Sequence, residues 1–329
     1  MGIREIYHKF WDWSENNVSG HERPVDEDIT FLENLQYGPD AKNNRFDVFF
    51  PNISCKRPTI FYLHGGGYIT GQKETRYKFC QRLAKNGYTV FNIEYTKCDD
   101  EQKKYFPDQV AEFFEFYNSI VKNEELCNLI DFDNVFLAGD SAGGHIATLV
   151  ANIQANPNLK FDYNLTGGPK IKGLVLLSSA MSITKLPEPL KSIYANIIFG
   201  KKETRNPLSK LTNNVDLATD LLPPILMISS KIDPVVGLQE KKFVKMAKKQ
   251  NLSLHQYVIC KGEKLGHDCV ILRSEKYPKT IEAIVNFVNN ATYGKFVNGV
   301  VIENIFEKNQ KPKKSKIKQE EQETQIEAV

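Results

Sequence analysis

The sequence predicts an α/β protein with a mostly parallel central sheet of about eight strands and helices on both faces. Short runs rich in β-branched and aromatic residues alternate with helix-length segments from about residue 58 onward. The short runs are apolar almost throughout, which is typical of strands that are covered on both faces. The chain has 329 residues, which is enough to bury one large core.

The expected elements follow one another in a regular order. An antiparallel pair is expected at 31–36 and 45–50, because a Gly-Pro-Asp turn at 38–40 separates the two runs. Further strands are expected at 59–63, 89–94, 134–138, 172–178, 225–229 and 254–260. Helices are expected at 74–86, 107–122, 142–155, 237–250 and 276–290. This alternation predicts parallel strands joined by helical crossovers.

Two segments do not follow the alternation, and we expect both to form a cap over the carboxyl edge of the sheet. Residues 1–30 carry Phe10, Trp11 and Trp13 amid charges, and residues 181–222 contain several prolines and an apolar patch. The alternative is surface decoration with no role in binding. We therefore expect a single domain over 1–305. The charged tail at 306–329 lacks the apolar residues needed to fold, so we expect it to be disordered.

The composition argues against several classes of function. Lys and Arg number 43 against 40 Asp and Glu, a balance that does not predict binding to nucleic acid or to an anionic membrane. There is no apolar stretch of transmembrane length and no apolar signal core, so we expect a cytoplasmic protein without stable membrane insertion. The six cysteines have no C-x-x-C spacing, and we read them as reduced thiols that hold no metal. The oligomeric state stays open, with a homodimer as one option.

The candidate nucleophile is Ser141, in the sequence Gly-Asp-Ser-Ala-Gly-Gly at 139–144. A G-x-S-x-G sequence between a buried strand and a helix holds its serine on a tight turn and exposes the hydroxyl. A serine in an ordinary strand–helix turn is the alternative. Because a serine hydroxyl is a poor nucleophile until a base removes its proton, the hypothesis requires a histidine nearby.

A second motif, His-Gly-Gly-Gly at 64–67, directly follows the expected strand 59–63. Ester hydrolysis passes through a tetrahedral oxyanion, which is stabilised by backbone N–H groups that already point at it. Consecutive glycines allow the backbone to approach closely. We expect the N–H groups of Gly66, Gly67 and Ala142 to form the oxyanion hole. We expect His64 to be an orienting, hydrogen-bonded residue, not the base.

Of the six histidines, His267 is the candidate base. It lies in a loop just after the last expected strand, at the carboxyl edge where open α/β sheets bind ligands. His145 follows Ser141 on the same helix, and its side chain should point away from the exposed turn. His255 begins an apolar strand and is expected to lie in the core or on a face of the sheet.

An acid must hold the imidazole in one tautomer and stabilise it when charged. Asp233 is the candidate, because it follows the strand 225–229 and precedes a proline that favours an extended backbone. An aspartate that caps the next helix is the alternative. Asp268 adjoins His267, so its carboxylate should point away from the imidazole. The order Ser141, Asp233, His267 is that of α/β-hydrolases.

The His-Gly-Gly-Gly and Gly-Asp-Ser-Ala-Gly-Gly motifs, with an Asp-Pro acid and a late Gly-His base, resemble hormone-sensitive-lipase-like carboxylesterases of the α/β-hydrolase fold. The resemblance extends from about residue 58 to residue 290. It implies that Gly66, Gly67 and Ala142 form the oxyanion hole. It also implies a helical cap built from the N-terminal segment and from an insertion after the sixth strand. By this resemblance the protein hydrolyses short-chain acyl esters, small-molecule substrates, without a cofactor.

One residue departs from the family pattern. The family often has asparagine where this chain has His145, and a histidine there also occurs in related formamidase-type and carbohydrate-deacetylating hydrolases. An amide or formamide hydrolase, similar to kynurenine formamidase, and a carbohydrate deacetylase therefore remain alternatives with the same catalytic residues. A ligand-binding module that has lost its chemistry is a third alternative.

Overall fold

The computed structural model describes residues 26–53, 55–99, 102–183, 190–261, 266–296 and 298–306. The first 25 residues of the expected N-terminal cap element lie outside these described residues. So do residues 307–329 of the expected charged tail.

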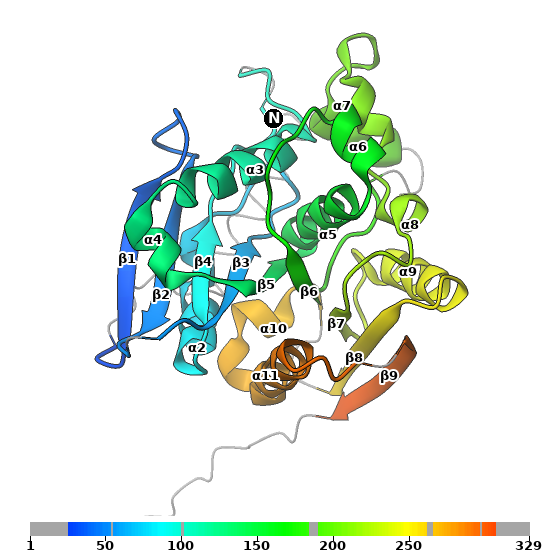
Figure 1. Cartoon of the computed structure of the whole chain (residues 1–329). Helices are drawn as coiled ribbons and strands as arrows, with labels where there is room; N and C mark the ends of the chain where they lie inside the picture. The colour runs from blue at the N-terminus through cyan, green and yellow to red at the C-terminus, as the bar shows by residue number, and fades with distance from the viewer. Residues whose placement is uncertain are drawn as a thin grey trace, which may run out of the picture.

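The described residues contain one nine-stranded sheet, with the strand order β1-β2-β4-β3-β5-β6-β7-β8-β9 (Figure 1). Strand β2 is antiparallel to β1 and β4, and all other neighbours are parallel. The strands are β1 (Ile29–Gln36), β2 (Arg45–Pro51), β3 (Pro58–Leu63), β4 (Thr89–Ile93), β5 (Asp131–Asp140), β6 (Ile171–Leu177), β7 (Ile225–Ser230), β8 (Ser253–Lys261) and β9 (Gly299–Phe306). The predicted fold class is confirmed.

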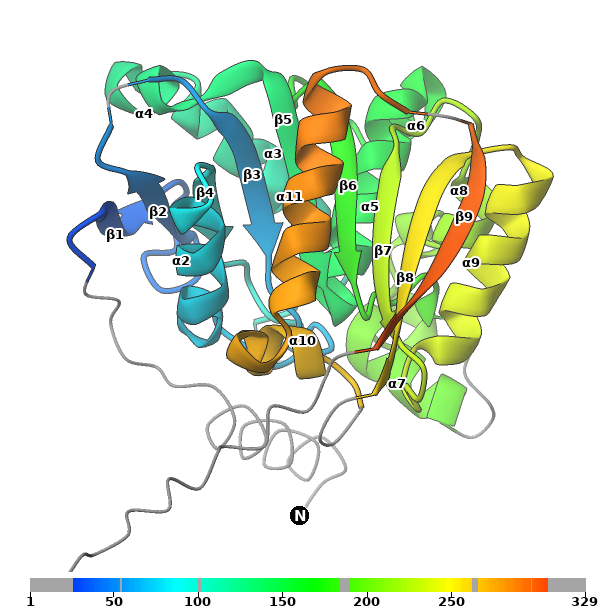
Figure 2. The same cartoon turned by 90° about the horizontal axis from the view of Figure 1, so that it is seen from below.

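Helices cover both faces of the sheet. Seen from below, α2 and α11 lie in front of the sheet and α3 and α5 lie behind it (Figure 2). The α-helices are α2 (Tyr77–Lys85), α3 (Asp108–Ile120), α4 (Glu124–Leu129), α5 (Ser141–Ala155), α6 (Pro157–Asp162), α7 (Leu190–Phe199), α8 (Asn214–Leu217), α9 (Gly237–Lys249), α10 (Cys269–Leu272) and α11 (Pro278–Thr292). The 3-10 helices are η1 (Lys73–Arg76), η3 (Lys202–Thr204), η4 (Pro207–Lys210) and η5 (Ser274–Lys276).

The side chains of the central strands alternate between two cores. In β5, Val135 and Leu137 pack in one cluster with α3, α5 and α9, whereas Phe136 and Ala138 pack in the other with α2 and α11. Fully burying a large apolar side chain contributes about 1.5–3 kcal/mol, so the two cores hold the central strands firmly. Rigid strands in turn fix the positions of the loops at their ends.

Strand β9 was not predicted. Its run of apolar residues is interrupted by Glu303 and Asn304, and Val301 and Ile302 are about half exposed. An edge strand has only one neighbour, here β8, and does not need the continuous apolar pattern by which the central strands were found. The short helices α4, α6, α8 and α10 were also not predicted, because a helix of so few turns has a weak periodic signal. Helix α7, ten residues long, lies in the segment 181–222 that was expected to form part of the cap.

The carboxyl ends of the parallel strands meet at one edge of the sheet. Helices α7 and α10 lie at this edge, which is the end toward which β3 points (Figure 2). The loops after β3, β5, β7 and β8 therefore come together here. Open α/β sheets bind their ligands at this edge.

Candidate active site

Ser141 lies at the junction of β5 and α5, where the chain turns sharply. Its φ angle is 48°, a left-handed conformation that is uncommon for residues other than glycine. A Cβ atom at position 143 would lie 2.0 Å from the carbonyl oxygen of Leu63, so only glycine allows α5 to approach β3 this closely. The glycines of the motif are therefore explained by packing, and the strained serine indicates a functional position.

The side chains of Ser141, His267 and Asp233 form one hydrogen-bonded chain. His267 Nε2 lies 2.8 Å from Ser141 Oγ, and His267 Nδ1 lies 3.0 Å from Asp233 Oδ2. The other carboxylate oxygen of Asp233 accepts hydrogen bonds from the N–H groups of Val235 and Val236, at 2.9 and 3.0 Å. Asp233 therefore both stabilises the turn before α9 and orients the imidazole.

The environment keeps Asp233 ionised. Burial by itself opposes the charge, but the hydrogen bond and the charge of His267 outweigh it and hold the pKa of Asp233 below its ordinary value. An ionised Asp233 accepts a hydrogen bond from Nδ1–H. This fixes the tautomer of His267 that leaves Nε2 toward Ser141.

Asp268 is a correction to the sequence analysis, which expected its carboxylate to point away from the imidazole. Asp268 Oδ2 lies 3.3 Å from His267 Nε2, the ring nitrogen that faces Ser141. The expectation holds for an extended backbone, in which adjacent side chains diverge. Asp268 instead has a left-handed backbone, with φ of 54°, and its carboxyl group turns back to the ring.

The glycine loop after β3 passes directly beside the serine. A Cβ atom on Gly65 would lie 3.1 Å from the Cβ atom of Ser141. The carbonyl oxygen of Gly65 contacts His64 Nδ1 at 2.6 Å, and that of Gly66 accepts from the backbone and hydroxyl of Thr70, both at 2.9 Å. In a trans peptide the N–H points opposite to the C=O. The N–H groups of Gly66 and Gly67 therefore point away from these partners.

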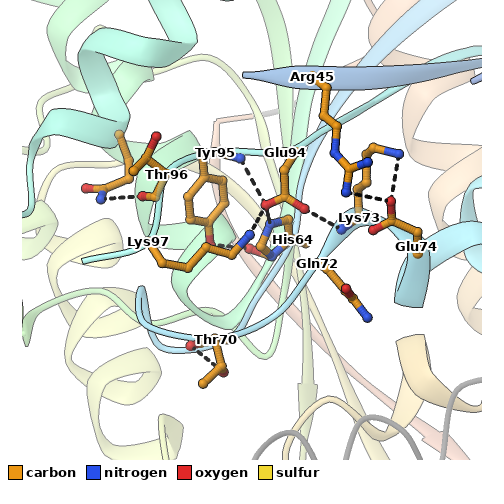
Figure 3. A network of polar contacts seen from close by, with 12 residues as sticks. Arg45, His64, Thr70, Gln72, Lys73, Glu74, Glu94, Tyr95, Thr96 and Lys97 are labelled. Atoms are coloured by element: carbon orange, nitrogen blue, oxygen red, sulfur yellow. Dashed lines mark hydrogen bonds and ion pairs between the residues drawn. The ribbon is translucent and has the colours of Figure 1, made fainter. Parts of the chain in front are cut away.

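His64 belongs to a buried network that supports this loop (Figure 3). Its Nε2 lies 2.8 Å from Glu94 Oε1, and its ring stacks on Tyr95, whose hydroxyl donates to the His64 carbonyl at 2.7 Å. Glu94 also accepts from the N–H of Lys73 and from the ammonium group of Lys97. His64 is thus a hydrogen-bonded, orienting residue, as predicted.

Burial opposes the charge of Glu94, but Lys97 and His64 together hold its pKa below the ordinary value. The sequence analysis did not identify this residue as functional. Its one signal was its position, at the carboxyl end of the strand expected at 89–94.

An ion pair between Asp140 and Arg76 lies under the serine. Arg76 Nη2 contacts Asp140 Oδ2 at 2.7 Å, Arg76 Nε contacts Oδ1 at 3.2 Å, and the Tyr62 hydroxyl donates to Oδ1 at 2.6 Å. All three side chains are buried. Burial opposes ionisation, but Arg76 keeps the pKa of Asp140 below its ordinary value. Neither residue of this pair was predicted from the sequence.

Glu240 is a buried acid on the first turn of α9. Burial and the nearby charge of Asp233 raise its pKa to about 8, so its carboxyl group is neutral near pH 7. A neutral Glu240 adds no repulsion next to Asp233 at that pH. The sequence offered no sign of this residue, because its role arises only from the packing of α9 against β7.

His145 points away from the serine, as predicted. Its Nε2 donates to the carbonyl oxygen of Thr212 at 2.8 Å. Burial lowers the pKa of His145 to about 4, so the ring is neutral. His145, the residue that departs from the family pattern, therefore holds the segment around residue 212 in place. His255 lies on β8 with its Nε2 2.9 Å from Glu303 of β9.

No cluster of three or more His, Cys, Asp or Glu side chains within the described ranges could hold a metal ion. None of the helices described for this chain combines the length and the apolar character that crossing a membrane requires.

The fold and the site define the class of protein. The strand order, the antiparallel second strand and the Ser141, Asp233 and His267 side chains after β5, β7 and β8 are those of the α/β-hydrolase fold. Residues 46–247 match the BD-FAE family model, and the chain belongs to this family. The expected relationship to α/β-hydrolase esterases is confirmed.

Curated relatives match part of the chain. A putative alpha/beta hydrolase of Acanthamoeba polyphaga mimivirus is 25% identical over 199 residues, which cover 58% of this chain and 56% of the relative. Isoprenylcysteine alpha-carbonyl methylesterase ICME of Arabidopsis thaliana is 25% identical over 223 residues, which cover 63% of this chain and 50% of the relative. The chain thus spans just over half the length of the first relative and half that of the second.

Solved esterase structures share the fold. Esterase B from Lactobacillus rhamnosis, with a bound tributyrin phosphonate inhibitor, has a TM-score of 0.78 at 22% identity. The match covers 88% of this chain and 96% of the esterase B chain. The esterase of Pyrobaculum calidifontis has a TM-score of 0.63 at 19% identity, with 90% and 93% covered.

Proposed function

We propose that this protein is a serine carboxylesterase that hydrolyses short-chain acyl esters through an acyl-enzyme intermediate. The observation that carries the proposal is the continuous hydrogen-bonded chain from Ser141 through His267 to Asp233. Both contacts lie within the range needed for general base catalysis. The three residues are proposed as nucleophile, base and acid.

The reaction follows from the geometry. His267 Nε2 takes the proton of Ser141 as Oγ bonds to the acyl carbon, and Asp233 stabilises the imidazolium that forms. The N–H groups of Gly66, Gly67 and Ala142 stabilise the oxyanion. Nε2 then gives its proton to the departing alcohol as the ester bond breaks. Water, deprotonated by Nε2, then attacks the acyl-enzyme in the same way, releasing the acid and restoring Ser141.

Two observations support the proposed oxyanion hole. The carbonyl groups of Gly65 and Gly66 are fixed by hydrogen bonds, and Ala142 lies at the start of α5. The first N–H groups of a helix have no partner within the helix and carry partial positive charge. Losing one donor of such a hole typically costs about 10²–10³ in kcat.

The relatives support an ester as substrate. One is named a methylesterase, and the esterase B structure contains a phosphonate inhibitor derived from tributyrin, an ester with four-carbon acyl chains. His145 does not favour the formamide or carbohydrate alternatives, because it is buried and bonded to the Thr212 carbonyl. The substrate proposed is therefore a small-molecule ester. We also propose that the protein acts in the cytoplasm, needs no cofactor, binds no nucleic acid and does not insert stably into a membrane.

A cap is proposed from residues 1–30 and 181–222 within a single domain over 1–305. Helix α7 supports this proposal, because the Tyr194 hydroxyl donates to the carbonyl oxygen of Gly67 at 3.0 Å. The cap therefore touches the proposed oxyanion loop directly. The side chains of such a cap would limit the length of the acyl chain.

The proposal is tested with p-nitrophenyl acetate. Ser141→Ala is expected to lower kcat by about 10⁶, because the nucleophile is lost. Ser119→Ala, a change of the same type on α3, serves as the control and should retain full activity. If Ser141→Ala keeps most of the activity, the assignment is wrong. If the wild type hydrolyses an aryl formamide but no aryl ester, the amide alternative holds instead.

A further inference from the structure

The site contains a second carboxyl group that the proposed mechanism does not use. Asp268 Oδ2 lies 3.3 Å from His267 Nε2, and Ser141 Oγ lies 2.8 Å from the same nitrogen. The proton that moves between serine, imidazole and substrate in the proposed reaction therefore has a carboxyl group beside it. Asp233 contacts the opposite ring nitrogen.

The Asp268 carboxyl group is buried and only partly satisfied. Its side chain is 5% exposed, and within the described ranges its Oδ1 atom has no hydrogen-bond partner. An ionised buried carboxylate without full hydrogen bonding is costly unless a positive charge lies against it. The imidazolium form of His267 supplies such a charge.

The charges around this pair come from several elements. In the described residues, the groups that act on His267 and Asp268 are Asp233 of the β7–α9 loop, Glu240 of α9, Asp140 at the end of β5 and Arg76 of η1. Arg76 is already committed to Asp140 through two contacts, at 2.7 and 3.2 Å. His267 contacts Asp268 directly, at 3.3 Å.

We propose that Asp268 is a positioning residue that holds a proton on His267 Nε2 in the resting enzyme and so shifts ester hydrolysis to alkaline pH. This inference rests on the proposed function of Ser141 and His267. Only neutral His267 can accept the proton of Ser141, so an imidazolium stabilised by Asp268 is an inactive resting form.

The titration of the pair is consistent with this role. Burial opposes a charged imidazole, but the carboxylates of Asp268 and Asp233 outweigh it and raise the pKa of His267 to about 9. Burial likewise raises the pKa of Asp268 to about 8, although His267 acts in the opposite direction, so Asp268 is ionised over the pH range in which His267 loses its proton.

Removing the carboxyl group has two opposite effects on the proposed reaction. The pKa of His267 falls, so more of the enzyme is active near pH 7. In the alkaline plateau, where His267 is neutral in both proteins, the variant loses a carboxylate that stabilises the imidazolium formed in the transition state. The two pH profiles should therefore cross, which a merely structural residue would not cause.

The test compares wild type with Asp268→Asn and Asp268→Gly. Both replacements suit the left-handed backbone at this position, so the turn is expected to persist. We expect the acid limb of kcat/KM for p-nitrophenyl acetate to move down by about one pH unit or more, and the alkaline plateau to fall. Asp220→Asn, an exposed aspartate before β7, is the matched control and should leave the profile unchanged.

A second readout does not depend on turnover. NMR titration of the His267 imidazole should show the same downward shift in both Asp268 variants. An unchanged His267 pKa in two folded variants overturns the inference. If the shift occurs while no variant and no wild-type protein hydrolyses an ester, the inference about His267 stands and the proposed function fails.

Discussion

The buried pair of Arg76 and Asp140 allows a quantitative test of what holds the serine turn in place. Arg76 contacts the carboxylate through Nη2 and Nε, at 2.7 and 3.2 Å, and its side chain is 1% exposed. Arg76→Met keeps much of the apolar stem and removes the charge. Asp140 then remains ionised and buried, with the Tyr62 hydroxyl among its remaining donors.

Breaking a buried ion pair by removing one partner costs about 3–5 kcal/mol, because the remaining charge is uncompensated. We expect Arg76→Met to lower the free energy of unfolding by that amount at neutral pH. Replacing both partners, in Arg76→Met/Asp140→Asn, removes the buried charge and should recover about half of the loss or more. The amide oxygen of the introduced asparagine can still accept the hydrogen bond from Tyr62.

The dependence on pH follows from the direction of the pKa shift. In the wild type the pKa of Asp140 is lowered, so the stability from the pair is present above the unfolded-state value of about 3.9 and is lost as the pH falls through the lower, folded-state pKa. In Arg76→Met, burial outweighs the remaining opposing influences of Tyr62 and His64 and raises the pKa of Asp140. The penalty should therefore be largest near neutral pH and become smaller toward about pH 5.

Urea unfolding followed by circular dichroism measures these differences. Arg82→Met, the same change on the adjacent helix α2, is the control. It removes a half-buried side chain that donates to the Ser274 carbonyl, and should cost about 1 kcal/mol. A loss below about 1 kcal/mol in Arg76→Met, or a double variant as unstable as the single one, would show that the uncompensated charge of Asp140 is not what destabilises the protein.

Three further predictions follow from single contacts. Gly143→Ala should lower stability by about 1–3 kcal/mol and reduce activity, because its Cβ would lie 2.0 Å from the Leu63 carbonyl oxygen, whereas Gly237→Ala, with 3.7 Å to its nearest neighbour, should unfold in urea like the wild type. Glu240→Gln should match wild-type stability at about pH 4 and exceed it by an amount that grows up to about pH 8, because the stability linked to the raised Glu240 pKa is fully present only below the unfolded-state value of about 4.3 and is lost as the pH rises to the folded-state value of about 8; an equal difference in urea midpoint between variant and wild type at both pH values would contradict this. Tyr194→Phe should lower kcat for p-nitrophenyl acetate by roughly two- to tenfold without unfolding the protein, because the glycine loop loses one hydrogen bond. An unchanged kcat would show that this contact with α7 does not affect catalysis.

The sequence predicted the sheet and the chain order of Ser141, Asp233 and His267 because these signals are local. A buried strand followed by G-x-S-x-G can be recognised within about ten residues. The carboxyl ends of parallel strands meet by topology alone, so residues after different strands could be placed at one edge without knowing any contact.

The residues that were missed depend on contacts between distant parts of the chain. Asp140 and Arg76 are 64 residues apart, and His64 and Glu94 are 30 apart. No periodic pattern in the sequence links residues that are this far apart. The predicted orientation of the Asp268 carboxylate was wrong for a local reason. This orientation depends on one left-handed φ angle, which the residue type alone does not determine.

Labelling with a fluorophosphonate shows whether Ser141 is the activated nucleophile, because the reagent modifies only an activated serine. We expect one adduct per folded chain, on the peptide that contains Ser141, and no adduct in Ser141→Ala. Labelling of His267→Asn should be slower by orders of magnitude, since the base is lost. An adduct at another residue, or an unmodified Ser141 in folded wild-type protein, would show that Ser141 is not the nucleophile.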